Sequence, residues 1–223
     1  MRTQAYFSRR RNRMNRNTLA QLILFTLIAG ALLPAAGPST SQASPEGGPG
    51  ASSLEPGVTA PDFTLKDSTS VEHSLQSLLK GSKLVIVDFW STKCPFSRGY
   101  EDKLKAIAGD YEGKGVKVLA VMSNQTEGPE DVRQYLEKTP LPYPVVIDPG
   151  SKVADRFGAQ TTPHIFVLDP SGTIRYVGAI DNGAKEPAGV KPYLRQALDA
   201  LLAGQAPPEA RTRNFGCSIK RKA

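Results

Sequence analysis

Cysteine, histidine and tryptophan are scarce in this 223-residue chain, which holds two cysteines, two histidines and one tryptophan. Structural zinc sites use clustered cysteine and histidine ligands, and this chain has no such cluster in its sequence. It also lacks the Cys-x-x-Cys-His pattern of haem attachment and a glycine-rich dinucleotide loop. We therefore expect no metal and no cofactor, so that the chemistry must come from side chains.

Acidic residues are absent from residues 1–43, which contain six arginines. The whole chain has 28 Lys and Arg against 21 Asp and Glu, a formal charge of +7, so removing those six arginines leaves 22 basic residues against 21 acidic ones. The basicity belongs to the N-terminal segment, and the remainder gives no reason to expect a nucleic-acid partner.

The N-terminal segment has the pattern of a targeting signal. An arginine-rich head precedes the apolar run 19–36, and Ser41-Gln42-Ala43 supplies small residues at alternate positions, as signal peptidase requires. Residues 1–43 are predicted to be a signal peptide or, alternatively, an N-terminal membrane anchor that tethers the protein through residues 19–36. Either interpretation predicts an extracytoplasmic location, periplasmic or secreted, where two cysteines indicate redox chemistry or a disulfide.

The rest of the chain divides into three parts. Residues 44–57, rich in Pro, Gly and Ser, are predicted to be a flexible linker. Residues 58–203 alternate apolar runs with helical periodicity, which predicts a central β-sheet flanked by helices in an α/β fold. Residues 204–223 are predicted to be a basic tail that carries Cys217. The expected strands are 84–90, 116–122, 143–147, 165–168 and 173–177, and the expected helices are one that begins at Pro95 and ends at Gly113, 129–138, 151–157 and 190–201.

Cys94 stands between an apolar strand and a helix. It follows the run Leu84–Trp90 and precedes Pro95, a residue that suits the first position of a helix. Unpaired N–H groups at a helix N-terminus favour an anion, so the pKa of this thiol should be lowered. Asp88 is an acid within the apolar run, and burial requires it to have either a partner or a raised pKa.

Three motifs carry a family resemblance. Val87-Asp88-Phe89-Trp90, followed by three residues and then Cys94-Pro95, resembles the active-site strand and turn of thioredoxin. Ala60-Pro61-Asp62-Phe63-Thr64-Leu65 and the helix and strand at 129–147 are similar to the redoxin branch. This branch comprises the alkyl hydroperoxide reductase/thiol-specific antioxidant (AhpC/TSA) group and exported thiol–disulfide oxidoreductases. Gln160-Thr161-Thr162-Pro163 stands where these families carry a cis-proline beside the active cysteine.

The resemblance implies a thioredoxin fold over residues 58–203, with a central mixed sheet, a redoxin-type N-terminal extension and a βα insertion. It also implies that Cys94 is the nucleophile and that Asp88 is a candidate general base, because the corresponding aspartate of thioredoxin relays protons. The substrate groove would be lined by Trp90, Pro95, Thr162 and Pro163.

Ser97 is the main departure from this family. Thioredoxins usually have a second cysteine there, and Cys94-Pro95-Phe96-Ser97 cannot close a local disulfide. The Ser97 hydroxyl is instead expected to donate a hydrogen bond to the Cys94 thiolate. The usual peroxidatic motif is incomplete as well, since Val87 replaces its proline.

Cys217 is the only other cysteine. It is either a resolving cysteine for Cys94 or part of a static disulfide, within the chain or with another one. The tail between residue 204 and Cys217 is long enough for Cys217 to reach Cys94, which permits the first alternative. Phe215 and Ile219 would then dock Cys217 against the apolar surface around Trp90.

The expected function is an extracytoplasmic thiol–disulfide oxidoreductase with Cys94 as nucleophile. Two alternatives are a thiol peroxidase, with Cys94 peroxidatic and Cys217 resolving, and a non-catalytic thioredoxin-like binding domain with a structural disulfide. The expected partners are protein thiols and disulfides or small peroxides, together with a thiol reductant.

Overall fold

The computed structural model describes residues 54–183 and 187–221. The predicted leader 1–43 and residues 44–53 of the predicted linker lie outside this part. Within the described ranges no helix is both long and apolar enough to cross a bilayer.

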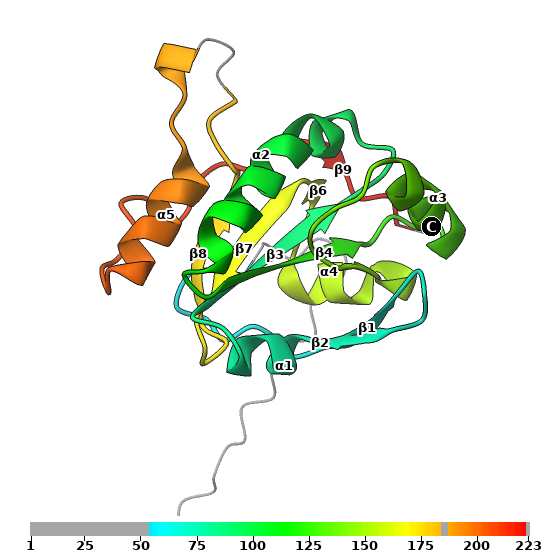
Figure 1. Ribbon diagram of the computed structural model, residues 1–223, viewed down its shortest axis with the longest axis horizontal. Coiled ribbons are helices and arrows are strands. Elements are labelled where there is room, and N and C mark those ends of the chain that lie inside the picture. Colours follow the sequence, from blue (N-terminus) through cyan, green and yellow to red (C-terminus); the bar gives the residue numbers. More distant parts are fainter. Residues whose placement is uncertain (1–53, 184–186, 222–223) are drawn as a thin grey trace, which may run out of the picture. The chain divides into compact units, whose positions relative to one another are not determined.

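A mixed seven-stranded sheet forms the centre of the domain, in the order β2-β1-β5-β4-β3-β7-β8 (Figure 1). Its middle strands β3, β4 and β5 are parallel, and antiparallel pairs add the outer strands on both sides. A second, two-stranded sheet pairs β6 with β9. The strands are β1 (Thr64–Asp67), β2 (Glu72–Ser74), β3 (Leu84–Trp90), β4 (Val116–Met122), β5 (Val145–Ile147), β6 (Thr161–Thr162), β7 (His164–Leu168), β8 (Ile174–Gly178) and β9 (Cys217–Ser218).

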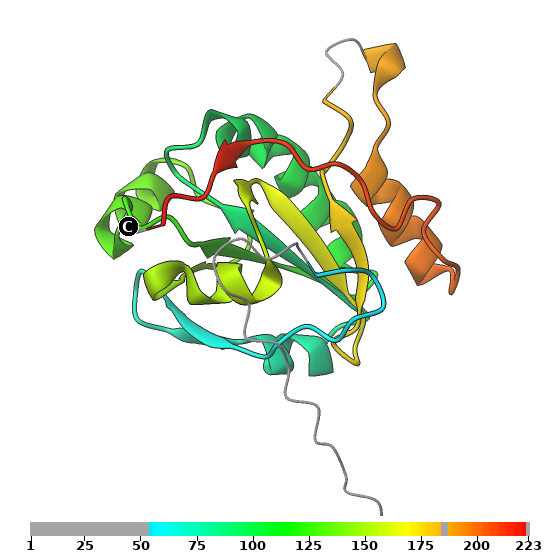
Figure 2. The same ribbon diagram turned by 180° about the vertical axis from the view of Figure 1, so that it is seen from behind.

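Helices cover both faces of the large sheet. One buried apolar cluster takes side chains from α2, α3 and α5, and the other takes them from α1 and α4. Figure 1 shows α2 lying across the sheet, and Figure 2 shows the domain from behind. The helices are α1 (Leu75–Lys80), α2 (Pro95–Glu112), α3 (Pro129–Lys138), α4 (Lys152–Phe157) and α5 (Tyr193–Leu202), with 3₁₀ turns at Pro149–Ser151 and Pro187–Gly189.

The apolar run of β3 is explained by this two-sided burial. Ile86 and Trp90 face the cluster under α2, whereas Val87 and Phe89 face the cluster under α4. Successive side chains of a strand point to opposite faces, so a strand covered on both faces is apolar throughout. The predicted α/β thioredoxin fold with its mixed central sheet is confirmed.

Residues just outside both ends of the predicted domain 58–203 also pack against it. Leu54, assigned to the linker, donates its backbone N–H to the carbonyl of Phe157 at 3.0 Å, and Gly57 donates to Ile174 at 2.7 Å. The predicted tail, coloured red in Figure 2, runs back across the domain and supplies β9. Residues 54–57 and 204–221 therefore pack with the thioredoxin-like domain.

Candidate active site

Cys94 is the N-cap residue of α2, and three residues separate it from the end of β3. Its Sγ accepts a hydrogen bond from the backbone N–H of Ser97 at 3.4 Å, and as a thiol it donates to the carbonyl oxygen of Thr162 at 3.0 Å. The Thr162–Pro163 peptide bond is cis, as predicted. Cys94 is only 2% exposed, because this cis-proline segment and the C-terminal residues lie beside it.

Cys217 reaches Cys94 through strand pairing. β9 runs antiparallel to β6, with Cys217 opposite Thr162 and Ser218 opposite Thr161. Since Thr162 also accepts the hydrogen bond from Cys94, the pairing brings together two cysteines that are 123 residues apart in the chain. Both are free thiols in the structure.

The two thiols have opposite pKa shifts. Burial raises the pKa of Cys94, but hydrogen bonds from Cys217 and from the Ser97 backbone outweigh it and leave that pKa below its ordinary value. Burial and the neighbouring Cys94 raise the pKa of Cys217. Cys94 is therefore the more acidic thiol of the pair, and once ionised it can accept a hydrogen bond from the Cys217 thiol. This polarity suits Cys94 as nucleophile.

We call residues 211–221 the C-terminal strap. Its start is held by the Thr212 N–H, which donates to Val177 at 3.0 Å, and Ile219 N–H donates to Gln160 at 2.9 Å. The backbone N–H of Lys220 donates to Oδ1 of Asn124, and its carbonyl accepts from Gln125, both at 2.7 Å. Hydrogen bonds on both sides of Cys217 thus hold the strap.

Of the two flanks of Cys217, only Phe215 docks on the predicted side, against Tyr100, which packs on the apolar cluster that contains Trp90. Phe215 packs edge-on against Phe96 and is tilted against Tyr100, with ring centroids 6.2 and 6.0 Å apart. Ile219 is buried in the cluster on the opposite face of the sheet from Trp90. The two flanks therefore contact different surfaces of the domain.

Asp88 lies inside the sheet, fully buried, and its Oδ1 has no hydrogen-bond partner among the described residues. Burial, with smaller contributions from the charges of Cys94 and Glu101, raises its pKa to about 8. Asp88 and Ser97 line the same small cavity. A carboxyl group that gains and loses its proton near neutral pH beside the nucleophile suits the predicted role of general base.

Some predicted site residues make other contacts than the sequence led us to expect. The Ser97 Oγ has no partner in the described structure, because the backbone N–H at the third helical position is the group that points back to the N-cap sulfur. Trp90 is 1% exposed and packs on Tyr135, so it is too deeply buried to line a substrate groove. Pro95 is exposed at the first position of α2, and Thr162 and Pro163 are buried beside Cys94.

Two basic residues, Lys93 and His164, do not act on the Cys94 sulfur. The Lys93 ammonium donates to the carbonyl of Thr126 at 3.0 Å and forms an ion pair with Asp131 at 3.2 Å. His164 is buried, and burial lowers its pKa to about 3, so it is neutral. Its ring packs on Phe166, on the α4 side of the sheet.

A buried polar network beneath the active-site turn was not predicted. Glu127 accepts hydrogen bonds from Ser91 Oγ at 2.6 Å, from Thr92 N–H at 2.8 Å and from Asn124 Nδ2 at 2.6 Å. Ser91 Oγ in turn accepts from the Cys94 N–H at 3.1 Å and from Asn124 Nδ2 at 2.9 Å. Because Asn124 also binds Lys220, one network joins the Cys94 turn to the strap.

A signal for this network was present in the sequence. Parallel strands end at the same edge of a sheet, and β3 and β4 were both predicted with their observed bounds. Polar residues following both strands should therefore meet at that edge. Ser91 follows β3, and Asn124 and Glu127 follow β4.

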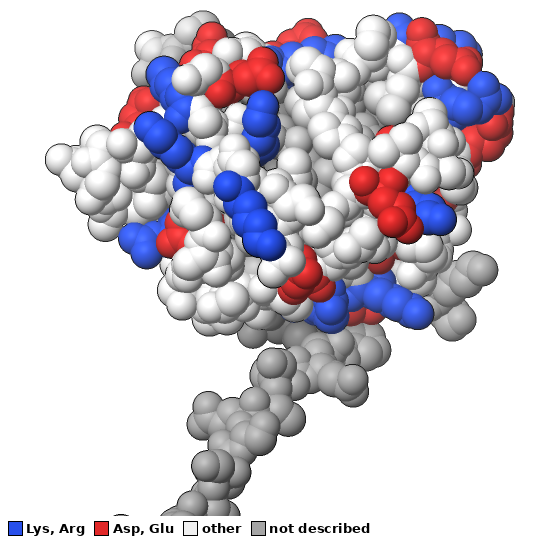
Figure 3. Space-filling view, turned by 60° about the horizontal axis from the view of Figure 1, so that its bottom comes forward, with Lys and Arg blue, Asp and Glu red and all other residues white. Residues whose placement is uncertain are grey.

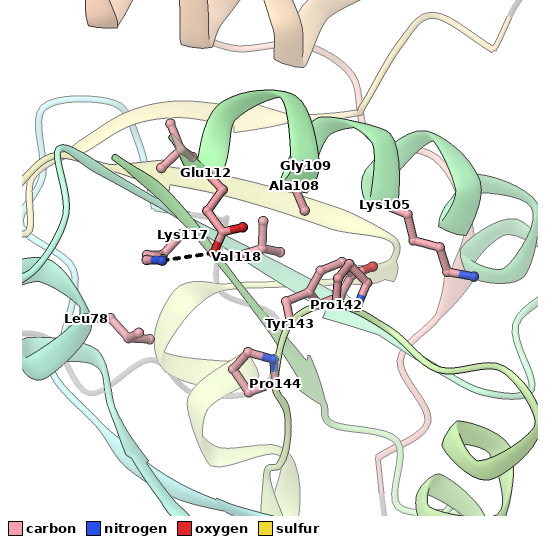
Figure 4. Close-up of a pocket in the computed structure, with 11 residues that line it drawn as sticks. Leu78, Lys105, Ala108, Gly109, Glu112, Lys117, Val118, Pro142, Tyr143 and Pro144 are labelled. Carbon is pink, nitrogen blue, oxygen red and sulfur yellow. Dashed lines mark hydrogen bonds and ion pairs between the residues drawn. The ribbon is translucent and has the colours of Figure 1, made fainter. Parts of the chain in front are cut away.

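Other surface features lie away from Cys94. A pocket of about 250 Å³ between α2, β4 and Pro142–Pro144 is drawn in Figure 4, where an ion pair joins Glu112 to Lys117. Acidic and basic side chains occur side by side on the face in Figure 3. Among the described residues no group of three or more His, Cys, Asp or Glu is placed to hold a metal.

Comparison with known proteins gives a consistent assignment. Residues 56–177 match the AhpC/TSA family. The thiol–disulfide oxidoreductase ResA of Geobacillus thermodenitrificans is 35% identical over 124 residues, covering 54% of this chain and 67% of the relative. ResA of Halalkalibacterium halodurans is 30% identical over 118 residues, covering 53% and 65%.

Solved structures extend the likeness beyond this segment. A protein of Sinorhizobium meliloti is 32% identical with a TM-score of 0.70, covering 77% of this chain and 97% of that one. A Chlorobium tepidum structure titled as a thiol:disulfide interchange protein, DsbE, is 29% identical with a TM-score of 0.57, covering 67% and 99%. The chain thus belongs to the AhpC/TSA family and is an oxidoreductase of its thioredoxin-like, thiol–disulfide branch.

Proposed function

We propose that this protein is an extracytoplasmic thiol–disulfide oxidoreductase in which Cys94 and Cys217 form the redox pair. Cys217 replaces the second cysteine that the Cys94-Pro95-Phe96-Ser97 motif lacks. The observation that carries the proposal is the pairing of β9 with β6, which sets Cys217 opposite the residue that binds the Cys94 sulfur.

The reaction requires no further group. The Cys94 thiolate attacks one sulfur of a substrate disulfide, forming a mixed disulfide and releasing the other sulfur as a thiolate. Cys217 gives its proton to Asp88 and attacks the Cys94 sulfur, forming the Cys94–Cys217 disulfide. The substrate cysteine leaves as a thiolate and takes up that proton to become a thiol. The substrate is reduced and the pair is oxidised, and an external thiol reductant restores it. Asp88 is suited to take the Cys217 proton, because burial raises its pKa to about 8.

Mapping of the disulfide tests the pair. The full chain is oxidised with a small disulfide and digested without reduction, with Cys94→Ser as the control. The Cys94–Cys217 crosslink is expected, and Cys217→Ser should accumulate mixed disulfides on Cys94. If the oxidised protein keeps Cys217 free while Cys94 is modified, the pair is refuted. If hydrogen peroxide forms the crosslink faster than disulfides do, the protein is a peroxidase instead.

The location rests on the leader. Its arginine-rich head, apolar run and small-residue site support export, and an oxidising compartment would supply disulfide substrates. Fusion of residues 1–57 to a reporter that is active only after export tests this, with a fusion lacking residues 19–36 as the control. A reporter that stays inactive would argue against an extracytoplasmic location.

A further inference from the structure

The strap covers the nucleophile. Cys94 is 2% exposed, so the disulfide of a folded partner cannot reach its sulfur while the strap is seated. Few backbone hydrogen bonds hold the strap at this point. β9 has two residues, and the hydrogen bond from Ile219 to Gln160 extends its pairing with β6. β6 is itself only two residues long and pairs with β9 alone in the described structure. An edge strand whose backbone groups become free can pair with another extended segment.

The contacts of the strap depend on its side chains. A side chain on Gly216 would overlap the carbonyl group of Thr162, so a glycine allows the close approach there. Two residues before the cysteine, Phe215 contacts Phe96 and Tyr100, and Phe96 remains 45% exposed. Two residues after it, Ile219 is 5% exposed. The glycine, the aromatic residue and the aliphatic residue around Cys217 thus each have their own contact site on the domain.

We infer that the strap occupies, within its own chain, the place of the substrate. The preferred substrate is an extended protein segment whose disulfide-bonded cysteine follows a glycine, with an aromatic residue before that glycine and an aliphatic residue two positions after the cysteine. Such a segment displaces the strap from β6 and presents its disulfide to Cys94. This inference rests on the proposed function, because it takes Cys94 as the nucleophile.

The exchange explains how one site serves two steps. When the external segment is paired with β6, its disulfide lies where Cys217 lies now, and Cys94 forms the mixed disulfide with it. The strap must then regain β6 to bring Cys217 to the Cys94 sulfur, and this return expels the product thiol. The hydrogen bonds of Thr212 and of Lys220, on either side of β9, keep the strap near β6.

Peptide reactivity tests the preference. The full-length Cys217→Ser protein is mixed with peptides of the sequence Asn214–Ile219 whose cysteine carries thionitrobenzoate as a mixed disulfide, and release of the coloured thiol is followed. A peptide with alanine at the position of Gly216 should react about tenfold more slowly, because overlap with packed backbone is penalised. Alanine at the position of Phe215 should also slow the reaction, since aromatic contacts contribute to binding.

Loosening the strap tests the competition. Phe215→Ala in the same Cys217→Ser protein should speed the reaction with the unchanged peptide several-fold, because it weakens the seated strap. Val71→Ala, at an exposed apolar residue of the β1–β2 turn, is the matched control and should not change the rate. Thermal unfolding of each variant confirms that it is folded.

The outcomes separate this inference from the proposed function. If Cys94 reacts with neither a small aromatic disulfide nor any peptide, the proposed function fails. If it reacts with all the peptides at one rate, or if Phe215→Ala changes nothing, the inference is overturned while the proposed function stands. Slower alanine peptides together with a faster Phe215→Ala protein would support it.

Discussion

Gly216 lies so close to Thr162 that a side chain at position 216 would overlap the Thr162 carbonyl group. That carbonyl accepts the hydrogen bond from Cys94, so the backbone of the strap, the cis-proline segment and the nucleophile meet at one point. The absence of a side chain at residue 216 is therefore a condition for bringing Cys217 to Cys94.

Gly216→Ala should slow formation of the Cys94–Cys217 disulfide by about tenfold, because β9 can no longer seat in its register. The measurement is the rate of crosslink formation by quenched mass mapping. Gly204→Ala is the control: residue 204 lies in the same C-terminal segment and has a positive φ, but no atom lies within 4 Å of the added carbon. Equal rates in the two variants would show that the overlap does not matter.

Cys94 should be alkylated with an inflection below the unperturbed thiol value of about 8.5. Since Cys217 donates to Cys94, Cys217→Ala should raise the Cys94 pKa, and Cys217→Ser should restore part of the shift because a hydroxyl also donates. The measurement is the alkylation rate of Cys94 against pH, resolved by mass spectrometry. An identical inflection in all three proteins would contradict the thiol–thiolate hydrogen bond.

Asp88→Asn should stabilise the protein above neutral pH and slow its resolving step. The folded-state pKa of Asp88, about 8, lies above its unfolded value, so the folded state holds the proton more tightly. This group's contribution to stability is full below the unfolded pKa near 4 and is lost as pH rises to about 8, by up to about 1.4 kcal/mol per pH unit.

Chemical denaturation from pH 5 to 9 measures this effect, and the asparagine variant should lack that slope. Asp102→Asn, at a side chain that is 99% exposed, is the control and should keep the slope. A slower Cys217 attack on the mixed disulfide, in a protein that is more stable, would distinguish a general base from a structural group. An unchanged rate would remove Asp88 from the mechanism.

Glu127→Gln should cost about 2–3 kcal/mol in the free energy of unfolding, because a buried carboxylate loses charge-assisted hydrogen bonds from Ser91 and Thr92. It should also slow alkylation of Cys94, whose turn these bonds hold. Urea denaturation gives the first effect and alkylation at fixed pH the second. Glu130→Gln, which removes an exposed carboxylate paired with Arg133, should change neither. If both variants lost a similar amount of unfolding free energy, the buried network would not be what stabilises the Cys94 turn.

The elements around Cys94 were predictable because their signals are local. An apolar run predicts β3, three- and four-residue spacing predicts α2, and Pro95 marks its start. The place of the Cys94 thiol at a helix N-terminus follows from these neighbours alone. The resemblance to thioredoxin predicted the cis bond before Pro163 as well. The seven-residue bounds of β3 and β4 were predicted without error.

The strap and the network beneath the turn were decided by tertiary structure. A two-residue strand such as Cys217–Ser218 has no periodicity, and its pairing with Thr161–Thr162 joins segments more than fifty residues apart. The sequence alone showed that Cys217 could reach Cys94 and left open whether it did. Its partner is determined by which backbone groups the folded domain leaves unpaired beside Cys94, and by the close approach that Gly216 allows. Hydrogen-bond satisfaction between distant segments is a property of the packed chain, so no local pattern encodes it.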